Sequence, residues 1–423
     1  MLSDKQITGL QYLALAVLGM WLFYKGVVPG WTTVHSDFGN YYVSARLVAG
    51  GANLDSLYND EWFHQQMIGM GVNTPGKFSP FPPITAWMLI PYSGFEPLDA
   101  QRLFVVVNLV FVLMCAYAWR KVSGWKRLPS LLMVLAGGAS LINNVAFGQM
   151  YLVMVTCLLT SLVLIERDRP LPASILLGGF AVIKYFPIVI IAGFFLLALI
   201  SPQPERRRYH LTVIYSSLTV IVLIVAQLLF FGTGIMKDYV VAALLPHLSS
   251  ELSGQGMYSY LFQSWDSLGR NLFVYDVASN PDPVVDWPAG RTLLKMFVTI
   301  IVLATSIIIM YVHWRSSSSR RFIVFLTMPA LALLVILPAS ATYHFILLLF
   351  PLALLLRDGA LSARAATLVV VLYSAIGFIP YGLAFRMADA AGLLFAFPRL
   401  LIVSLLFFFV AWALSGKSTK VTS

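Results

Sequence analysis

Long uncharged apolar runs are the feature that most limits what this chain can fold into. Runs of about 20 residues recur along the whole 423-residue sequence, and each is long enough to cross a bilayer as a helix. Only 11% of the residues are charged, whereas a soluble domain carries about 25%. The short alternating strands of a membrane barrel are absent from the sequence. The sequence therefore predicts an all-α polytopic membrane protein.

Twelve apolar segments are predicted to cross the membrane, and residues 1–423 are expected to form a single transmembrane domain. The predicted spans cover residues 8–28, 100–119, 128–147, 149–165, 172–186, 187–200, 211–231, 291–313, 321–338, 342–356, 366–384 and 393–414. We interpret the first as an uncleaved span, because no small-residue cleavage site follows it. Residues 172–200 are short enough to form either two tilted spans or one re-entrant hairpin.

A further apolar stretch, residues 81–95, is interrupted by three prolines and a glycine. It is too short to span easily and is predicted to be re-entrant or interfacial. With this stretch kept out of the count, the loops assigned to the cytoplasm carry 17 of the 28 Lys and Arg residues but only 5 of the 18 Asp and Glu residues. This positive-inside pattern predicts that both termini are cytoplasmic.

Two long loops, residues 29–80 and 232–290, then face outwards and are expected to cap any site on that side. Apolar residues at helical spacing in the second loop predict a helix that lies on the membrane surface. These residues are Tyr258, Leu261, Phe262, Trp265, Leu268 and Leu272. The net charge of +10 does not indicate a nucleic-acid partner, because the basic residues follow the membrane topology.

Five polar positions in this apolar chain need an explanation, and the topology places all of them on the outer face. They are Asp37, Gln149, Lys184, Arg270 and His344. Because the topology was derived from other residues, this convergence predicts a polar site at the outer surface.

Asp37 stands at the start of a predicted surface helix that runs to about residue 49. It is the candidate catalytic residue, and Asn40, Tyr41, Tyr42 and Gln149 are candidate substrate contacts. A structural alternative exists for two of them. Asp37 could cap the helix that it begins, and Gln149 could satisfy backbone groups at a tight turn.

Four basic residues are candidates for binding a phosphate group. Lys184 is an ionisable residue within apolar sequence, where such residues are costly and usually functional, although its side chain could instead extend to the interface. His344 could simply be hydrogen-bonded within the fold. Arg270 and Arg399 are weaker candidates, and a salt bridge to Asp266 would explain Arg270 equally well.

Several motifs are absent from the sequence. There is no Walker loop after a strand, no Rossmann glycine fingerprint, no His or Cys cluster with zinc spacing and no pair of carboxylates whose spacing suggests a metal site. The two cysteines, Cys115 and Cys157, fall within apolar spans and indicate no disulfide framework. We therefore expect no cofactor and no metal. Without a nucleotide fold, an enzyme on the outer face would use an activated lipid rather than a nucleotide sugar.

The order of several short motifs resembles glycosyltransferase family 87, polyprenyl-phosphate-mannose-dependent enzymes of the GT-C superfamily. The motifs are SDFGNYYVSARLVAGGANLDSLYN (36–59), FSPFPP (78–83), FGQM (147–150), IKYFP (183–187) and the histidine before LLLFPLALLL (347–356). The resemblance implies a GT-C-like fold and an acidic base in the first outer loop, which maps onto Asp37. It also implies a lysine and a histidine near the donor phosphate, which map onto Lys184 and His344.

The chain departs from the family pattern at two places. Met150 and Tyr151 follow Gln149 where the family often has asparagine, and Leu337, Pro338 and Tyr343 replace an often-seen Ser-Pro and tryptophan. These departures affect the prediction of the sugar and of the acceptor more than the prediction of the reaction class.

The resemblance implies that a sugar, mannose or a similar hexose, moves from a polyprenyl-phosphate donor to a hydroxyl of a glycolipid or polysaccharide. The reaction would occur on the outer face of the cell's inner (plasma) membrane, with membrane lipids as the other partners. One base and no nucleophile predict inversion. A transporter or flippase of lipid-linked sugars would share the spans and the buried lysine, but the paired half-structures common in transporters are not seen. A structural scaffold would leave Asp37 and Lys184 unexplained.

Overall fold

The computed structural model describes residues 3–249, 256–357, 359–380, 382–383, 386 and 392–416. Within these ranges the regular structure is helical, with one isolated bridge between Asp276 and Asn280, which confirms the predicted all-α class. The chain begins with α1 (Asp4–Leu22), η1 (Phe23–Val27), α2 (Val28–Thr32), α3 (Ser36–Ala49), α4 (Asp60–Gly69), α5 (Ile84–Met88), η2 (Ile90–Tyr92), α6 (Pro97–Ser123), α7 (Arg127–Leu135) and α8 (Ala139–Phe147).

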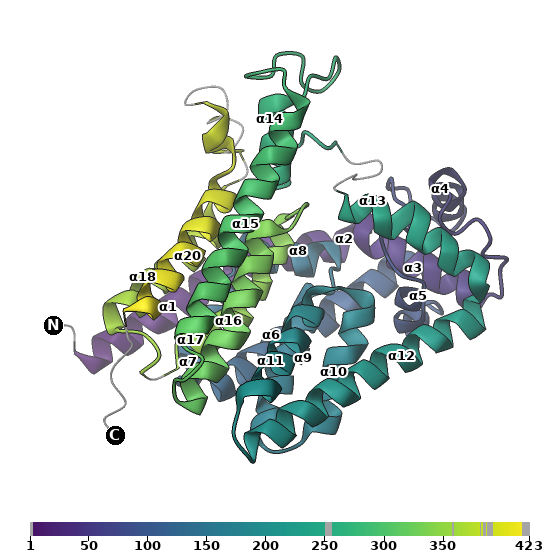
Figure 1. Ribbon diagram of the computed structural model, residues 1–423. Helices are drawn as coiled ribbons and strands as arrows, with labels where there is room; N and C mark the ends of the chain where they lie inside the picture. The colour runs from purple at the N-terminus through teal and green to yellow at the C-terminus, as the bar shows by residue number, and fades with distance from the viewer. Residues whose placement is uncertain are drawn as a thin grey trace.

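The middle and the end of the chain form a second series of helices, which pack beside the first (Figure 1). This series contains α9 (Tyr151–Glu166), α10 (Pro170–Ile183), α11 (Phe186–Ile200), α12 (Glu205–Asp238), η3 (Tyr239–Leu244), α13 (Leu245–Leu248), α14 (Trp265–Phe273), α15 (Pro288–Val312), α16 (Ser318–Ile336), η4 (Thr342–Leu348), α17 (Leu349–Leu355), α18 (Ala363–Phe378), η5 (Leu393–Ala396) and α20 (Pro398–Ser415). Helix α12 packs along α10 and α11, and α11 in turn packs against α16.

The lengths and the surface of the helices are those of a multi-pass membrane protein. Within the described residues, six helices are long and apolar enough to cross a bilayer, or seven if the bent pair α7 and α8 counts as one span. Helix α12 exposes large apolar side chains such as Ile221 and Leu229, which suits contact with lipid. Five further apolar helices are shorter than 18 residues. The predicted total of twelve spans and the GT-C-like arrangement therefore stay predictions.

The predicted span at residues 128–147 is not one straight helix. Helices α7 and α8 meet at an angle of 75°, and Gly138 at the break has a φ of +55°. A Cβ atom at this position would lie 2.4 Å from the carbonyl oxygen of Gly377, so that only glycine allows the close approach of the two backbones. The adjacent Gly137 and Gly138 were a usable signal of this bend, which the prediction of one span left out.

The first long loop provides elements that form the site. Helix α3 forms where a surface helix was predicted, but nine of its 14 residues are buried, so that it packs within the protein rather than on its surface. Residues 81–95 form only α5 and η2. Because an α-helix rises 1.5 Å per residue, the five residues of α5 cover about 7.5 Å and cannot cross a bilayer. The expectation that this stretch does not cross as a helix therefore agrees with the structure.

The second long loop differs from its prediction in two respects. Of residues 258–272, which were predicted to form a surface helix, only those in α14 are helical, and residues 258–264 form turns and irregular structure before it. The beginning of the loop is also helical, in the last residues of α12, in η3 and in α13. The apolar face of α14 was expected to lie on the membrane surface. Instead, Leu268 packs in a small cluster with Ala396, Phe397 and Leu400, so that the helix is held against the C-terminal part of the protein.

Candidate active site

A cavity of about 350 Å³ opens among the ends of helices from three parts of the chain. Its volume lies within the range of small-molecule sites, about 300–1,000 Å³. Helices α3 and α4 form one side, the link between α10 and α11 forms another, and η3 with α13 passes beside α3 and α4 (Figure 1). The residues predicted from the sequence that line this cavity are Asp37, Asn40, Gln149, Lys184 and His344.

Asp37 projects into the cavity from the first turn of α3. His35 occupies the position before the helix and no side chain caps it, so that the capping interpretation of Asp37 is wrong. The Gln149 side chain donates a hydrogen bond to the Asp37 carboxylate and accepts one from the Tyr41 hydroxyl at 3.2 Å. Tyr41 is fully buried. This chain of hydrogen bonds holds the carboxylate from the buried side and leaves it facing the cavity.

The backbone of Gly148 makes the placement of Gln149 possible. Gly148 ends α8 with a φ of +71°, a conformation that residues other than glycine adopt at a cost. A Cβ atom here would lie only 2.7 Å from the Cβ of Phe38 on α3. The glycine therefore lets the turn lie directly against α3. The Gln149 side chain binds two side chains rather than the helix end that the structural alternative required.

Lys184 lies outside both α10 and α11, in the short link between them. Pro187 at the second position of α11 fits a helix start, and Lys184 itself is extended, with φ −143° and ψ 128°. Its ammonium nitrogen lies 4.6 Å from the ring centroid of Phe81 and 4.9 Å from that of Tyr151. Lys184 therefore points into the cavity and does not extend away to an interface.

Asp37 and Lys184 influence each other's ionisation. Burial raises the pKa of the Asp37 carboxyl, while the hydrogen bond from Gln149 and the charge of Lys184 act to lower it. Burial lowers the pKa of Lys184 to about 8, and the charge of Asp37 opposes this shift. A carboxyl and an ammonium with shifted pKa values in one cavity are typical of functional sites.

His344 lines the cavity, but both of its ring nitrogens already have partners. Nδ1 accepts a hydrogen bond from the Ala341 backbone N–H at 3.0 Å, and Nε2 lies 2.7 Å from the Tyr151 hydroxyl. Because Nδ1 is an acceptor, a neutral ring carries its proton on Nε2 and donates it to the Tyr151 oxygen. The Tyr151 hydroxyl proton is then directed away from His344. Thus the structure supports the alternative that His344 is hydrogen-bonded within the fold.

Several cavity residues were missed from the sequence. Tyr151 and the pair formed by Tyr185 and His247, whose side chains are 3.0 Å apart, lie near Lys184. A second carboxylate, Asp60, also lines the cavity and lies 3.8 Å from Lys77. The tyrosine in the IKYFP motif was a usable signal for Tyr185, but the sequence around His247 gave none. Among the described residues, no three His, Cys, Asp or Glu side chains are grouped as a metal site requires.

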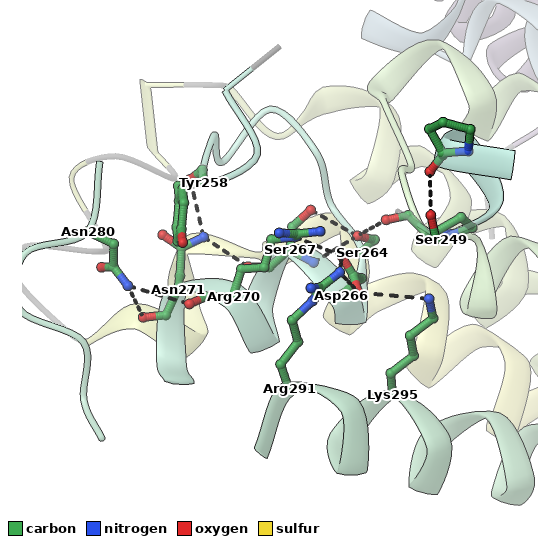
Figure 2. Close-up of polar contacts among 12 residues, drawn as sticks. Ser249, Tyr258, Ser264, Asp266, Ser267, Arg270, Asn271, Asn280, Arg291 and Lys295 are labelled. Atoms are coloured by element: carbon green, nitrogen blue, oxygen red, sulfur yellow. Dashed lines mark hydrogen bonds and ion pairs between the residues drawn. The ribbon is translucent and has the colours of Figure 1, made fainter. Parts of the chain in front are cut away.

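Arg270 lies outside the cavity lining and is bound to Asp266, as Figure 2 shows. Its Nε donates to the Asp266 carboxylate at 3.2 Å, and Arg291 and Lys295 of α15 approach the same carboxylate at 2.9 and 3.9 Å. Asp266 is 3% exposed. The cluster therefore joins α14 to α15, and the salt-bridge alternative accounts for the position of Arg270.

Three other predicted residues also lie outside the cavity lining. Arg399 is fully buried, and its guanidinium donates to the carbonyl oxygens of Ile376 and Ile379 at the end of α18. Tyr41 supports the site from outside, through its hydrogen bond to Gln149 and its ring contact with Phe81. The Tyr42 hydroxyl donates to the Phe95 carbonyl at 2.7 Å, away from the cavity.

The fold and the cavity define a multi-pass membrane protein that holds a carboxylate and an ammonium in one pocket. The family model of glycosyltransferase family 87 matches residues 80–338, more than half of the chain. The chain belongs to this family and is thus a membrane glycosyltransferase, which confirms the resemblance seen in the motifs. The match includes Gln149 and Lys184, whereas Asp37 and His344 lie outside it. No curated protein matches the chain.

Proposed function

We propose that the protein transfers a hexose, mannose or a similar sugar, from a polyprenyl-phosphate donor to a hydroxyl of a glycolipid or polysaccharide. The reaction takes place on the outer face of the inner membrane, where the donor lipid enters the cavity from the bilayer. One observation carries this proposal: the Asp37 carboxylate and the Lys184 ammonium share a cavity and interact electrostatically. In a displacement at an anomeric carbon, the carboxylate suits the attacking hydroxyl and the ammonium suits the departing phosphate.

The proposed reaction is a single displacement. The acceptor oxygen forms a bond to the anomeric carbon while the bond between that carbon and the phosphate oxygen breaks. Asp37 takes the proton of the acceptor hydroxyl, and general-base help of this kind contributes about 10²–10⁴-fold. The electron pair of the broken bond leaves with the polyprenyl phosphate, and the Lys184 ammonium stabilises the developing negative charge.

The hydrogen bonds behind Asp37 and Tyr151 support these roles. The buried Gln149 side chain holds the carboxylate in one orientation, so that little reorganisation is needed when the acceptor binds. Tyr151 receives the His344 hydrogen bond and lies beneath the Lys184 ammonium. Its hydroxyl proton is thus available to a phosphate oxygen. His344 acts as a positioning residue for Tyr151 in this proposal.

The presence of Asp60 in the cavity makes the stereochemical outcome informative. A retaining reaction needs a carboxylate nucleophile close to the anomeric carbon, and Asp60 is instead engaged with Lys77. We therefore expect inversion, with an α-linked product from a β-linked donor. A β-linked product from this donor would contradict the single displacement and would point to Asp60 as a nucleophile.

Transfer by purified protein in detergent, with labelled polyprenyl-phosphate sugars as donors, tests the proposal. Asp37→Asn keeps the shape of the side chain and removes the base, and we expect turnover to fall at least about 10²-fold. Asp55→Asn is the matched control, because Asp55 is exposed in the same loop and does not line the cavity. Full turnover in the Asp37 variant would refute the role of the base. Flipping of the labelled lipid in vesicles without turnover would favour a transporter.

A further inference from the structure

A second set of polar side chains lies in the cavity on the side formed by α4. Asp60 and His64 both line the cavity and are four residues apart on α4, which places them one above the other on one helix face. Lys77 reaches this face from the following loop, with its ammonium 3.8 Å from the Asp60 carboxylate. Its side chain is only 14% exposed, so that the ammonium is held within the cavity wall.

Asn40 connects this set to the catalytic carboxylate. Asn40 lies one helical turn after Asp37 on α3 and also lines the cavity. The loop before Lys77 passes directly over it, because a Cβ atom at Gly76 would lie 2.2 Å from the Asn40 Oδ1 and 2.7 Å from the Met67 sulfur. Glycine is therefore required for this contact. We name Asn40, Asp60, His64 and Lys77 together the α4 wall.

Two polar atoms of the α4 wall are buried without a hydrogen-bond partner among the described residues. They are the Oδ1 of Asn40 and the Nδ1 of His64, and Asn40 as a whole is only 7% exposed. Buried polar atoms in folded proteins are nearly always hydrogen-bonded. A ligand that carries hydroxyl groups would supply the missing partners.

We propose that the α4 wall is the subsite that binds the hydroxyl groups of a sugar ring on the acceptor. This inference rests on the proposed function, because the acceptor must approach the base, and the α4 wall begins one turn from Asp37. The contacts of Lys184 are instead with Phe81 and Tyr151, on the side assigned to the donor phosphate. The two ends of the cavity thus take the two substrates.

The chemistry of the α4 wall selects a sugar over an apolar alcohol. Each hydroxyl group of a sugar ring both donates and accepts hydrogen bonds. The wall offers a carboxylate that only accepts, an ammonium that only donates, and an imidazole and an amide that do either. An apolar alcohol would leave the buried Oδ1 of Asn40 and the buried Nδ1 of His64 without hydrogen-bond partners, which is costly. A soluble oligosaccharide and the head group of a glycolipid present the same ring hydroxyls.

The test compares acceptor binding with the reaction of the donor alone. Full-length protein in detergent is assayed for transfer to soluble mannose oligosaccharides and to the same glycans on a lipid, and for donor hydrolysis by water. We expect Asp60→Asn and His64→Leu to raise the acceptor KM roughly 10- to 100-fold, the loss that follows from a missing hydrogen bond to a charged or buried group. Donor hydrolysis, which does not use the α4 wall, changes far less.

Two further variants control for folding and charge. His64→Gln keeps a hydrogen-bonding side chain at the same position and should recover part of the acceptor affinity that His64→Leu loses. Glu61→Gln removes a charge from an exposed position of the same helix turn and should leave the acceptor KM unchanged. Whether the wild type transfers the sugar to the soluble oligosaccharide or to the lipid-linked glycan shows which of the two is the acceptor.

Two results overturn the inference, and they are distinguishable. If Asp60→Asn and His64→Leu lower transfer and donor hydrolysis equally at an unchanged acceptor KM, the α4 wall is not the acceptor subsite. If the wild type neither transfers the sugar nor hydrolyses the donor, the proposed function itself fails.

Discussion

The protonation of Lys184 should set the pH above which transfer is lost. Lys184 acts as a cation in the proposed reaction, and burial lowers its pKa to about 8. The Lys184 side chain is therefore almost fully protonated well below pH 8, and it loses its charge as the pH rises through this value. Tyr185, the neighbouring residue, does not interfere, because burial raises its pKa to about 12. We expect an alkaline limb in kcat/KM with its midpoint near pH 8.

The size of the effect follows from this pKa. Roughly 90% of Lys184 is protonated at pH 7 and roughly 10% at pH 9, so that kcat/KM falls about tenfold between these values. In Lys184→Arg the guanidinium stays charged throughout this range. The variant should lose overall rate, because the longer side chain changes the position of the charge, but it should show no alkaline limb below pH 10.

The assay is transfer from a labelled polyprenyl-phosphate sugar at low donor concentration between pH 6 and 10. The donor is a phosphodiester and does not titrate in this range. Lys237→Arg is the matched control, because Lys237 is exposed at the end of α12 and should retain the wild-type limb. An unchanged midpoint in Lys184→Arg would show that another group controls the alkaline limb and would refute the reasoning.

Two other substitutions test the contact of Gln149 with Asp37 and that of Asp266 with Arg270. Gln149→Leu removes the hydrogen bond that lowers the pKa of Asp37, so that the acid limb of the pH profile should move to higher pH and kcat should fall about tenfold or more; an unmoved acid limb would contradict the role of Gln149. Asp266→Asn leaves Arg270 without its buried counter-charge and should lower the free energy of unfolding by about 3 kcal/mol, seen as a lower thermal unfolding temperature at an unchanged donor KM. A raised donor KM would instead indicate that Arg270 contributes to donor binding.

Much of the candidate site could be predicted because a polar or charged group in apolar sequence is costly wherever the chain folds. Asp37, Gln149 and Lys184 were singled out on this ground, and the structure brings them into one cavity. The same reasoning failed for Arg270 and Arg399. A buried cation needs partners, and nothing local shows whether these partners belong to the fold or to a substrate. Here they belong to the fold.

Apart from Asn40, the residues of the α4 wall escaped prediction for a related reason. Asp60, His64 and Lys77 lie in an ordinary polar stretch of the first long loop, where such residues are unremarkable. Their proximity to the cavity depends on how α4 and the loop before Lys77 pack on α3, and the glycine contact at Gly76 shows how close that packing is. A polar residue in a polar segment gives no local sign of such a role.

The sequence by itself determined the membrane class, the helical fold and the position of α3 along the chain, because the length of an apolar run and the charges at its ends act locally. The tertiary structure alone decided the angle between α7 and α8, the partners of each polar side chain and the extent of the cavity. The hydrogen bond between Tyr41 and Gln149 joins residues 108 positions apart, and that between Tyr151 and His344 joins residues 193 positions apart. Contacts at such separations depend on the packing of whole helices, which no local pattern specifies.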